Sequence, residues 1–304
     1  MKMIMSITES INPLSTDLDK LSSLDIVRVF KDDLYQLISA IEKAENNIAN
    51  LIDLAAEALS KGASIIYVGA GTSGRLGILD AVECPPTFSS EPNMVKAIIA
   101  GGEKAIKDAV EGAEDNENLG REDILSMLNL DKDSKSQDLV IGISASGGAA
   151  YVEAAMQTAS KFGAITALIT NNPEAKIKNT VSHCVILNTG AEILSGSTRL
   201  KAGTAQKIVL NMISTGAMVK IGKTFGNLMI DVKVSNKKLK TRAINLISLI
   251  TKCEKEIAER ALELSYSKVK QAILYIEKNL DFNSATKLLD KHAGFLSKAL
   301  EDNQ

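Results

Sequence analysis

The sequence predicts an α/β protein: a three-layer αβα sandwich on a mainly parallel five-stranded sheet, with N-terminal helices before it and a small C-terminal helical unit after it. Five short apolar runs follow Gly62, and each is closed by glycine or polar residues before a helix-like segment begins. Apolar runs of this kind are typical of strands buried on both faces. Their alternation with helices indicates right-handed crossovers and therefore parallel pairing.

Residues 10–60, before the sheet, are expected to be helical. Thr16 with Asp19 and Ser22 with Asp25 have the spacing of capping boxes, which mark the starts of helices. Apolar residues then recur at helical intervals, among them Leu34, Leu37, Ile38 and Ile41. We expect these helices to pack on the sheet.

The five apolar runs are the predicted strands, and they lie at 63–68, 95–100, 139–143, 165–170 and 184–187. After them, residues 200–221 form a long predicted helix rich in small and apolar residues. The lysine-rich stretch 233–242 is typical of a linker or a domain edge. Only helical periodicity remains from residue 243 onward, so we predict a sheet domain with its N-terminal helices at 1–240 and a small helical domain at 241–304.

Composition excludes several function classes. The 304-residue chain has a formal net charge of −2 and only 4% aromatic residues, which gives no broad field or stacking platform for nucleic acid. No apolar run approaches the roughly 20 residues that a membrane span needs. The two histidines show no metal-ligand spacing, so no metal is expected. Three widely spaced cysteines, Cys84, Cys184 and Cys253, favour a reducing compartment, and we expect the protein in the cytoplasm.

A glycine-rich turn follows the first predicted strand. Residues 68–77 read VGAGTSGRLG, and Gly69, Gly71 and Gly74 form the pattern G-x-G-x-x-G. Such a turn lets a ligand approach the backbone and the free N–H groups of a helix start. A dinucleotide site would also need an acidic residue near the end of the second strand, and 95–102 contains none. The pattern therefore disfavours a nicotinamide cofactor.

A second loop of serines and glycines follows the third predicted strand, where residues 142–149 read GISASGGA. Ligands bind outside the carboxyl ends of parallel strands. Hydroxyls and backbone amides without a lysine suit a terminal phosphomonoester better than a nucleoside triphosphate. Each loop alone is equally compatible with simple helix capping or close packing, but the two together favour a sugar phosphate.

Long blocks of the chain resemble the N-acetylmuramic acid 6-phosphate etherases, which belong to the sugar isomerase (SIS) domain class. The strongest block, 69–86, reads GAGTSGRLGILDAVECPP. Further similarity lies at Thr8, Glu9 and Asn12, and at 99–102, 109–115, 190–192, 201–207, 225–229 and 290–295. The resemblance covers nearly the whole chain. It implies an SIS fold, release of D-lactate from N-acetylmuramic acid 6-phosphate without metal or organic cofactor, and a homodimer.

The resemblance also implies two catalytic carboxylates. Glu83 corresponds to a catalytic glutamate, to which we assign protonation of the departing lactate oxygen, and Cys84-Pro85-Pro86 is expected to end its helix abruptly. Glu114 corresponds to an essential acid/base residue, to which we assign removal of the C2 proton. A three-residue spacing is expected to put Glu111 and Glu114 on one helix face. Without the resemblance, both glutamates are equally compatible with a solvated surface.

The expected phosphate contacts are Thr72, Ser73, Ser144 and Ser146, with the amides of Gly147 and Gly148. Relatives usually continue the serine loop as Ser-Gly-Arg-Thr-Pro-Tyr, whereas this chain reads Ser146-Gly147-Gly148-Ala149-Ala150-Tyr151. An arginine and a threonine hydroxyl are therefore absent, which should weaken phosphate binding. Further expected substrate contacts are Glu192, which resembles a family site residue, and Lys201, a possible cation alongside Arg199.

Two other functions share this architecture. A non-catalytic sugar-phosphate-binding regulator is one, because the glucokinase regulatory protein is similar, but it is longer and holds a second sandwich. A phosphosugar isomerase is the other, since it also needs a base at C2. A transcription regulator of the class would add a basic helix-turn-helix, and residues 1–60 lack such a basic cluster.

Overall fold

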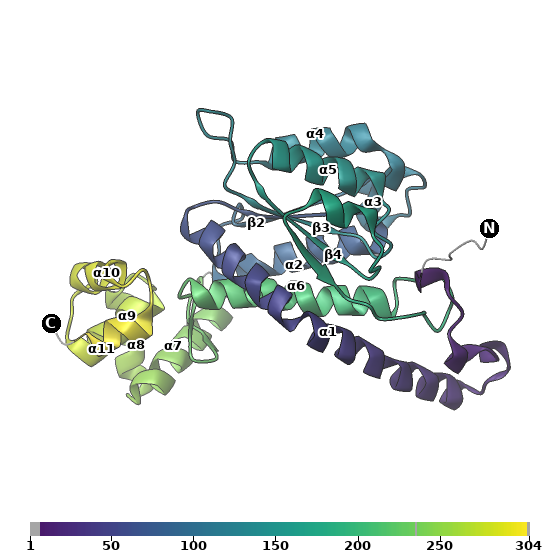
Figure 1. Ribbon diagram of the computed structural model, residues 1–304. Helices are drawn as coiled ribbons and strands as arrows, with labels where there is room; N and C mark the ends of the chain where they lie inside the picture. Colours follow the sequence, from purple (N-terminus) through teal and green to yellow (C-terminus); the bar gives the residue numbers. More distant parts are fainter. Residues whose placement is uncertain (1–6, 235, 303–304) are drawn as a thin grey trace. The chain divides into compact units, whose positions relative to one another are not determined.

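The computed structural model describes residues 7–234 and 236–302, and the chain forms two compact units (Figure 1). The first, called the sheet unit, comprises the chain up to Val82 together with Asn93–Ser214. The second, called the helical unit, comprises Glu83–Pro92 and the chain from Thr215 onward. The domain boundary expected at residue 240 stays a prediction.

The five predicted strands form one sheet in the sheet unit. Its strands are β1 (Ile65–Gly69), β2 (Val95–Ile99), β3 (Leu139–Ile143), β4 (Ile165–Thr170) and β5 (His183–Ile186), in the order β2-β1-β3-β4-β5. All four neighbouring pairs are parallel. Every residue of β1 and β3 is buried, which explains why these strands are recognisable as unbroken apolar runs.

The N-terminal segment contains one long helix instead of several. Short 3-10 turns occupy Ile7–Glu9, Pro13–Ser15 and Leu18–Lys20, and α1 then spans Ser23–Ser60. Ser22 caps α1, because its hydroxyl accepts a hydrogen bond from the Asp25 amide. That predicted start is confirmed. The start expected at Thr16 is wrong, because Thr16 instead follows the Pro13–Ser15 turn, which Asn12 caps.

Helices cover both faces of the sheet (Figure 1). On one face lie α4 (Glu117–Met127) and α5 (Ala150–Lys161), which pack on each other and on the strands. Their core contains Ile66, Val68, Val140 and Leu168 from the strands with Ile124, Val152 and Met156 from the helices. On the other face lie α1, the start of α2 (Gly71–Phe88) and most of α6 (Lys201–Lys220). The predicted three-layer sandwich is confirmed.

Short elements complete the sheet unit. These are α3 (Lys104–Lys107) and two 3-10 helices, Ala113–Asp115 and Lys176–Thr180. Among the helices of the described residues, none has the length and apolar character needed to cross a lipid bilayer.

Within its described residues, the helical unit contains a small hairpin, five whole helices and the ends of α2 and α6. The hairpin strands β6 (Thr224–Phe225) and β7 (Leu228–Met229) are antiparallel, and Gly226 at their turn has a φ of +54°. The helices are α7 (Lys237–Thr251), α8 (Lys255–Leu264), α9 (Val269–Lys278), α10 (Phe282–Lys291) and α11 (Leu296–Glu301). Their core includes Ile247, Leu262, Ile273 and Leu289. The linker expected at 233–242 is only partly right, because Asn236 caps α7 and the lysines from Lys237 are helical.

Candidate functional site

The two glycine loops lie at neighbouring strand ends. Gly69, the last residue of β1, pairs with Ile143, the last residue of β3. The helices that follow, α2 and α5, cover opposite faces of the sheet (Figure 1). Strands β1 and β3 therefore flank the topological switch point, which is where parallel α/β sheets bind their ligands.

Close backbone packing dictates the glycines of the first loop. A Cβ on Gly69 would lie 2.6 Å from the Gly74 amide nitrogen, and one on Gly74 would lie 2.5 Å from the Ile99 side chain. Gly71 has a φ of +52°, a conformation that glycine adopts at little cost. The turn thus enters α2 within two residues, and the first N–H groups of α2 have no intrahelical partner.

The second loop is shaped by its own serines. Ser144 is buried and its Oγ accepts a hydrogen bond from the Gly147 amide at 3.1 Å. Ser146 is exposed, and its Oγ accepts a bond from the Gly148 amide at 3.3 Å. Gly147 is buried and has a φ of +68°. Ser146 is therefore the serine of this loop whose side chain is open to solvent, whereas Ser144 sets the turn.

Ser73 of the first loop begins a buried chain of amide hydrogen bonds. Its hydroxyl donates to Gln206 Oε1 at 2.8 Å, and Gln206 Nε2 donates to Asn171 Oδ1 at 2.9 Å. Asn171 Nδ2 donates in turn to the Leu187 carbonyl at 3.0 Å. This chain of hydrogen bonds connects the first loop to α6 and to the carboxyl ends of β4 and β5. Gln206 and Asn171 are not among the site residues predicted from the sequence, although Gln206 belongs to the block 201–207.

Thr72 lies beside the start of α6. Its side chain is half-buried, and its methyl carbon lies 3.3 Å from the position that a Cβ on Gly203 would occupy. Gly203 therefore allows the first turns of α2 and α6 to approach closely. Both helices begin next to the predicted phosphate loops.

Glu114 lies on the 3-10 helix Ala113–Asp115, and its side chain is exposed. It lines a cavity of about 170 Å³ whose wall also includes Gly71 of the first loop, Arg75 of α2 and Glu111. The structure therefore brings Glu114 to the first glycine loop. The expected helix face shared by Glu111 and Glu114 is wrong, because Glu111 precedes Gly112, whose φ of +70° interrupts the backbone before the helix.

Arg75 holds the segment that leads to Glu114. Its Nε donates to the Ile106 carbonyl at 3.2 Å, and its Nη2 donates to the Asp108 carbonyl at 2.7 Å. The planar guanidinium makes these bonds from two separate nitrogens in a rigid fork, a geometry that the single ammonium of a lysine does not reproduce. Arg75 thereby fixes the end of α3 against α2, six residues before Glu114.

Glu83 lies near the end of α2 in the helical unit, and its side chain is exposed. The abrupt helix end expected at Cys84-Pro85-Pro86 is wrong, since α2 continues through both prolines to Phe88. Cys84 and Phe88 are buried, 2% and 5% exposed. Their burial holds the last turn in helical form despite the hydrogen bonds that the prolines remove.

Glu192 caps α6. Its two carboxylate oxygens accept hydrogen bonds from the amides of Lys201, at 3.0 Å, and Ala202, at 2.7 Å. These N–H groups belong to the first turn of the helix, where a negative charge is favourable. Burial raises the pKa of Glu192, and the hydrogen bonds from Ala202 and Lys201 oppose that rise.

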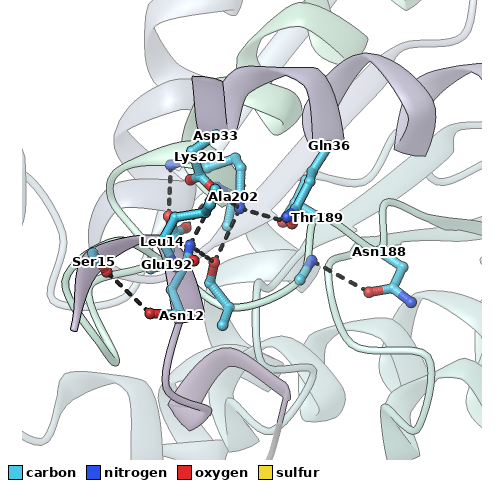
Figure 2. Close-up of polar contacts among 12 residues, drawn as sticks. Asn12, Leu14, Ser15, Asp33, Gln36, Asn188, Thr189, Glu192, Lys201 and Ala202 are labelled. Atoms are coloured by element: carbon cyan, nitrogen blue, oxygen red, sulfur yellow. Dashed lines mark hydrogen bonds and ion pairs between the residues drawn. The ribbon is translucent and has the colours of Figure 1, made fainter. Parts of the chain in front are cut away.

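Lys201 is buried among protein acceptors, and Figure 2 shows its ammonium turned toward Asp33 of α1. Nζ lies 2.7 Å from Asp33 Oδ1, 3.2 Å from Gln36 Oε1 and 3.0 Å from the Ala191 carbonyl. Asn12 donates to the same Asp33 oxygen and to the same carbonyl. Three segments far apart in sequence thus meet here. A substrate contact for Glu192 or Lys201 stays a prediction, as it does for Thr72, Ser73, Ser144, Ser146 and Gly147.

Three family models match the chain. The N-terminal SIS domain of glucokinase regulatory protein matches residues 47–160, and the SIS domain matches residues 124–216. The C-terminal lid domain of glucokinase regulatory protein matches residues 226–291. Together these models cover the sheet with its loops and most of the C-terminal helices.

Two curated relatives are similar over nearly their whole lengths. An N-acetylmuramic acid 6-phosphate etherase from Escherichia coli O1:K1 is 46% identical over 301 residues, which is 99% of each chain. An N-acetylmuramic acid 6-phosphate etherase 1 from Bacillus licheniformis is 47% identical over 293 residues, covering 96% of this chain and 95% of the relative.

Proposed function

The chain belongs to the family of N-acetylmuramic acid 6-phosphate etherases, and on that premise we propose that it cleaves the D-lactyl ether of N-acetylmuramic acid 6-phosphate. The products are N-acetylglucosamine 6-phosphate and D-lactate. The observation that carries the proposal is that Glu114 lines one cavity with Gly71 of the first glycine loop. A group bound by that loop therefore has an acid/base residue beside it. The reaction requires neither a metal nor an organic cofactor.

The phosphate is bound at the switch point of the sheet. Ser146 offers an exposed hydroxyl, and Thr72 offers a half-buried one at the first turn of α2. The amides at the start of α2 add hydrogen-bond donors and the positive end of the helix dipole. Ser73 and Ser144 support these groups through their own internal hydrogen bonds.

The chemistry is an elimination followed by a hydration. In the open-chain sugar the C1 aldehyde acidifies the C2 proton, and the lactyl ether at C3 lies β to that carbonyl. Glu114 removes the C2 proton while Glu83 protonates the departing lactate oxygen, so the C3–O bond breaks and an unsaturated aldehyde remains. Water then adds at C3 and a proton returns to C2. The two carboxyl groups need opposite protonation states at the start of the cycle.

The test is release of D-lactate from N-acetylmuramic acid 6-phosphate. Glu83→Gln and Glu114→Gln should each lower turnover by at least about 100-fold, the usual contribution of a positioned acid or base, and Glu111→Gln serves as the exposed control that lines the same cavity. Turnover in deuterated, ¹⁸O-enriched water should place deuterium at C2 and ¹⁸O at C3. Near-normal lactate release by both variants would refute the assignment, and isomerised sugar phosphate without lactate would indicate an isomerase.

We further propose that the protein works as a homodimer in the cytoplasm. Leu24, Val27, Phe30, Leu34 and Ile38 of α1, called the α1 stripe, share one helix face and are 42–63% exposed. Their spacing of three and four residues is typical of a helix face that packs on a partner. Exposed apolar residues gathered on one face mark an interaction site, and a second copy of the chain presents the same stripe.

A further inference from the structure

The helical unit contains a cavity that the proposed reaction does not use. Its volume is about 670 Å³, and every residue that lines it belongs to this unit. The walls come from four segments: the end of α2 with the loop that follows it, the turn before β6 that contains Lys223, the irregular segment 230–234, and the connection between α8 and α9 with the first turn of α9. This volume lies within the usual range for small-molecule sites, about 300–1,000 Å³.

The charges around the cavity are mostly positive. Lys223, Lys233, Lys268 and Lys270 line it, against the carboxylates of Glu91 and Asp231. Asp231 is shared, because Lys223 Nζ lies 3.1 Å from its Oδ2 and Lys270 Nζ lies 3.1 Å from its Oδ1. One carboxylate therefore serves two ammonium groups. Even if Glu91 neutralises a lysine at the rim, the cavity retains a positive excess.

Hydrogen bonds fix the side chain of Lys270 in the wall of the cavity. Its ammonium donates to the carbonyls of Gly222, at 2.9 Å, and Gly294, at 3.0 Å. Burial lowers the pKa of Lys270, while Asp231 opposes that lowering. An anion in the cavity would act in the same sense as Asp231 and would favour the charged form of the lysine.

Strained backbone positions and an unpaired buried hydroxyl also line this cavity. Ser89, Tyr266 and Ser267 line it, and their φ angles of +47°, +51° and +63° are left-handed, which is uncommon for residues other than glycine. Ser90 lines it as well, is 6% exposed, and has a hydroxyl without a hydrogen-bond partner among the described residues. Strained backbone angles and unpaired buried hydroxyls cost free energy and are concentrated at functional sites. A ligand in the cavity can supply the missing hydrogen-bond partner of Ser90.

From this geometry we infer a second ligand site in the helical unit, which binds a monosaccharide-sized anion with a phosphate or carboxylate as its charged group. Lys223 holds the anionic group, because it is the less buried of the two lysines that share Asp231. The serines 89, 90 and 267 face the sugar hydroxyls, and Ile230, Val232 and Val234 form an apolar wall for a methyl or acetyl substituent. The inference rests on this unit alone and does not depend on the reaction proposed above.

The absence of tryptophan from the chain permits a local reporter. Tyr266 lines the cavity, is 74% exposed and packs edge-on against Phe282. Tyr266→Trp therefore introduces one tryptophan, whose emission can be excited selectively over the remaining tyrosines, with little change in backbone preference. This variant of the full chain is titrated with N-acetylglucosamine 6-phosphate, N-acetylmuramic acid and neutral N-acetylglucosamine. A saturating fluorescence change is expected with one or both anions and not with the neutral sugar, and the anion that binds identifies the charged group.

Second substitutions in the Tyr266→Trp background assign the signal to the cavity. Lys223→Gln should weaken anion binding by about tenfold or more, as expected for loss of a charge-assisted hydrogen bond. Lys238→Gln, an exposed lysine of α7 outside the cavity, and Ser146→Ala in the second glycine loop should leave the titration unchanged. Circular dichroism shows that each variant is folded. No saturating change with either anion, an equal response to the neutral sugar, or unaltered affinity in folded Lys223→Gln would overturn the inference.

Discussion

The ammonium of Lys201 lies 2.7 Å from the Asp33 carboxylate, and both side chains are almost closed to solvent, at 2% and 4% exposed. Lys201 is the first residue of α6 and Asp33 lies on α1, so this pair joins the start of one helix to the side of another. Desolvation makes a buried pair costly to form, but removing one partner leaves an uncompensated charge.

Lys201→Met should lower the free energy of unfolding by about 3–5 kcal/mol, because Asp33 would remain buried and lose its cation. The double variant Asp33→Leu/Lys201→Met should recover much of that loss, since neither charge is then buried. Urea unfolding followed by circular dichroism measures both. Equal losses in the single and double variants would show that packing of the lysine stem, and not the charge, is responsible.

Gly147 and Gly148 form a matched pair in the second loop. Gly147→Ala should cost about 2 kcal/mol or more and disturb the loop, because a left-handed φ costs about 1–2 kcal/mol and its Cβ would lie 2.1 Å from that of Ala175. Gly148→Ala should be tolerated, because its nearest neighbour is Ser146 Oγ at 3.7 Å. Thermal unfolding and lactate release measure the two effects. Similar behaviour of the two variants would contradict the geometry.

Arg75→Lys should lower the rate of lactate release by about tenfold with little loss of stability. The single ammonium of a lysine does not reproduce the fork by which Nε and Nη2 of Arg75 donate to the Ile106 and Asp108 carbonyls. The segment before Glu114 would therefore lose part of its anchor, and even small displacements of a catalytic group are costly. Arg121→Lys is the control, because Arg121 pairs with Glu117 at the exposed surface of α4. The idea fails if both lysine variants keep full activity.

Asp80 makes the stability of the sheet unit depend on pH. Burial raises the pKa of Asp80 above 3.8, although hydrogen bonds from Asn211, Tyr67 and Ser214 oppose the rise. The folded state therefore binds more protons between the unfolded and folded pKa values, and this contribution to stability is lost as pH rises through the folded pKa.

Asp80→Asn removes that dependence. The stability of the variant relative to the unmodified protein should therefore increase as the pH rises above about 4, the ordinary aspartate pKa. Urea unfolding midpoints of both proteins at several values between pH 4 and 7 measure the difference. A difference that does not change with pH would mean that Asp80 titrates normally in the folded protein.

Substitution in the α1 stripe tests the proposed dimer. Val27→Glu together with Ile38→Glu should shift the protein to a monomer, because two charges would have to be buried in an otherwise apolar contact. Each position is more than half exposed in the single chain, so folding of the monomer should persist. Sedimentation velocity measures the change, with Lys43→Glu as the charge control, because Lys43 is an exposed residue of α1 that lies off the stripe. Unchanged sedimentation would exclude the stripe as the contact.

The strands and glycine loops could be predicted because burial on two faces and tight turns each restrict residue choice. The unbroken apolar run of β3 and the crowding at Gly69 and Gly74 are direct results of that restriction. The register of β1 on β3, which puts both loops at the same level, needed the structure. The strands β6 and β7 have two residues each, which is too short for a recognisable periodicity.

The surroundings of polar residues could not be predicted in this way. The bonds of Lys201 to Asp33 and Gln36 could not be predicted, because both partners lie more than 160 residues away in the sequence. The capping of α6 by Glu192 could not be predicted either, because the carboxylate reaches a helix that begins nine residues later and no local pattern marks that pairing. No sequence pattern identifies Gln206 and Asn171, because the sequence does not distinguish a buried, hydrogen-bonded amide side chain from an exposed one.

The pairing of Gly69 with Ile143 has a consequence for how this chain can change over evolution. The distance between the two glycine loops is set by the spacing of adjacent strands, about 4.8 Å, and the main chain maintains it whatever side chains the loops carry. Replacement of the usual arginine, threonine and proline by Gly148, Ala149 and Ala150 can therefore alter which molecules bind without changing the backbone spacing of the two loops.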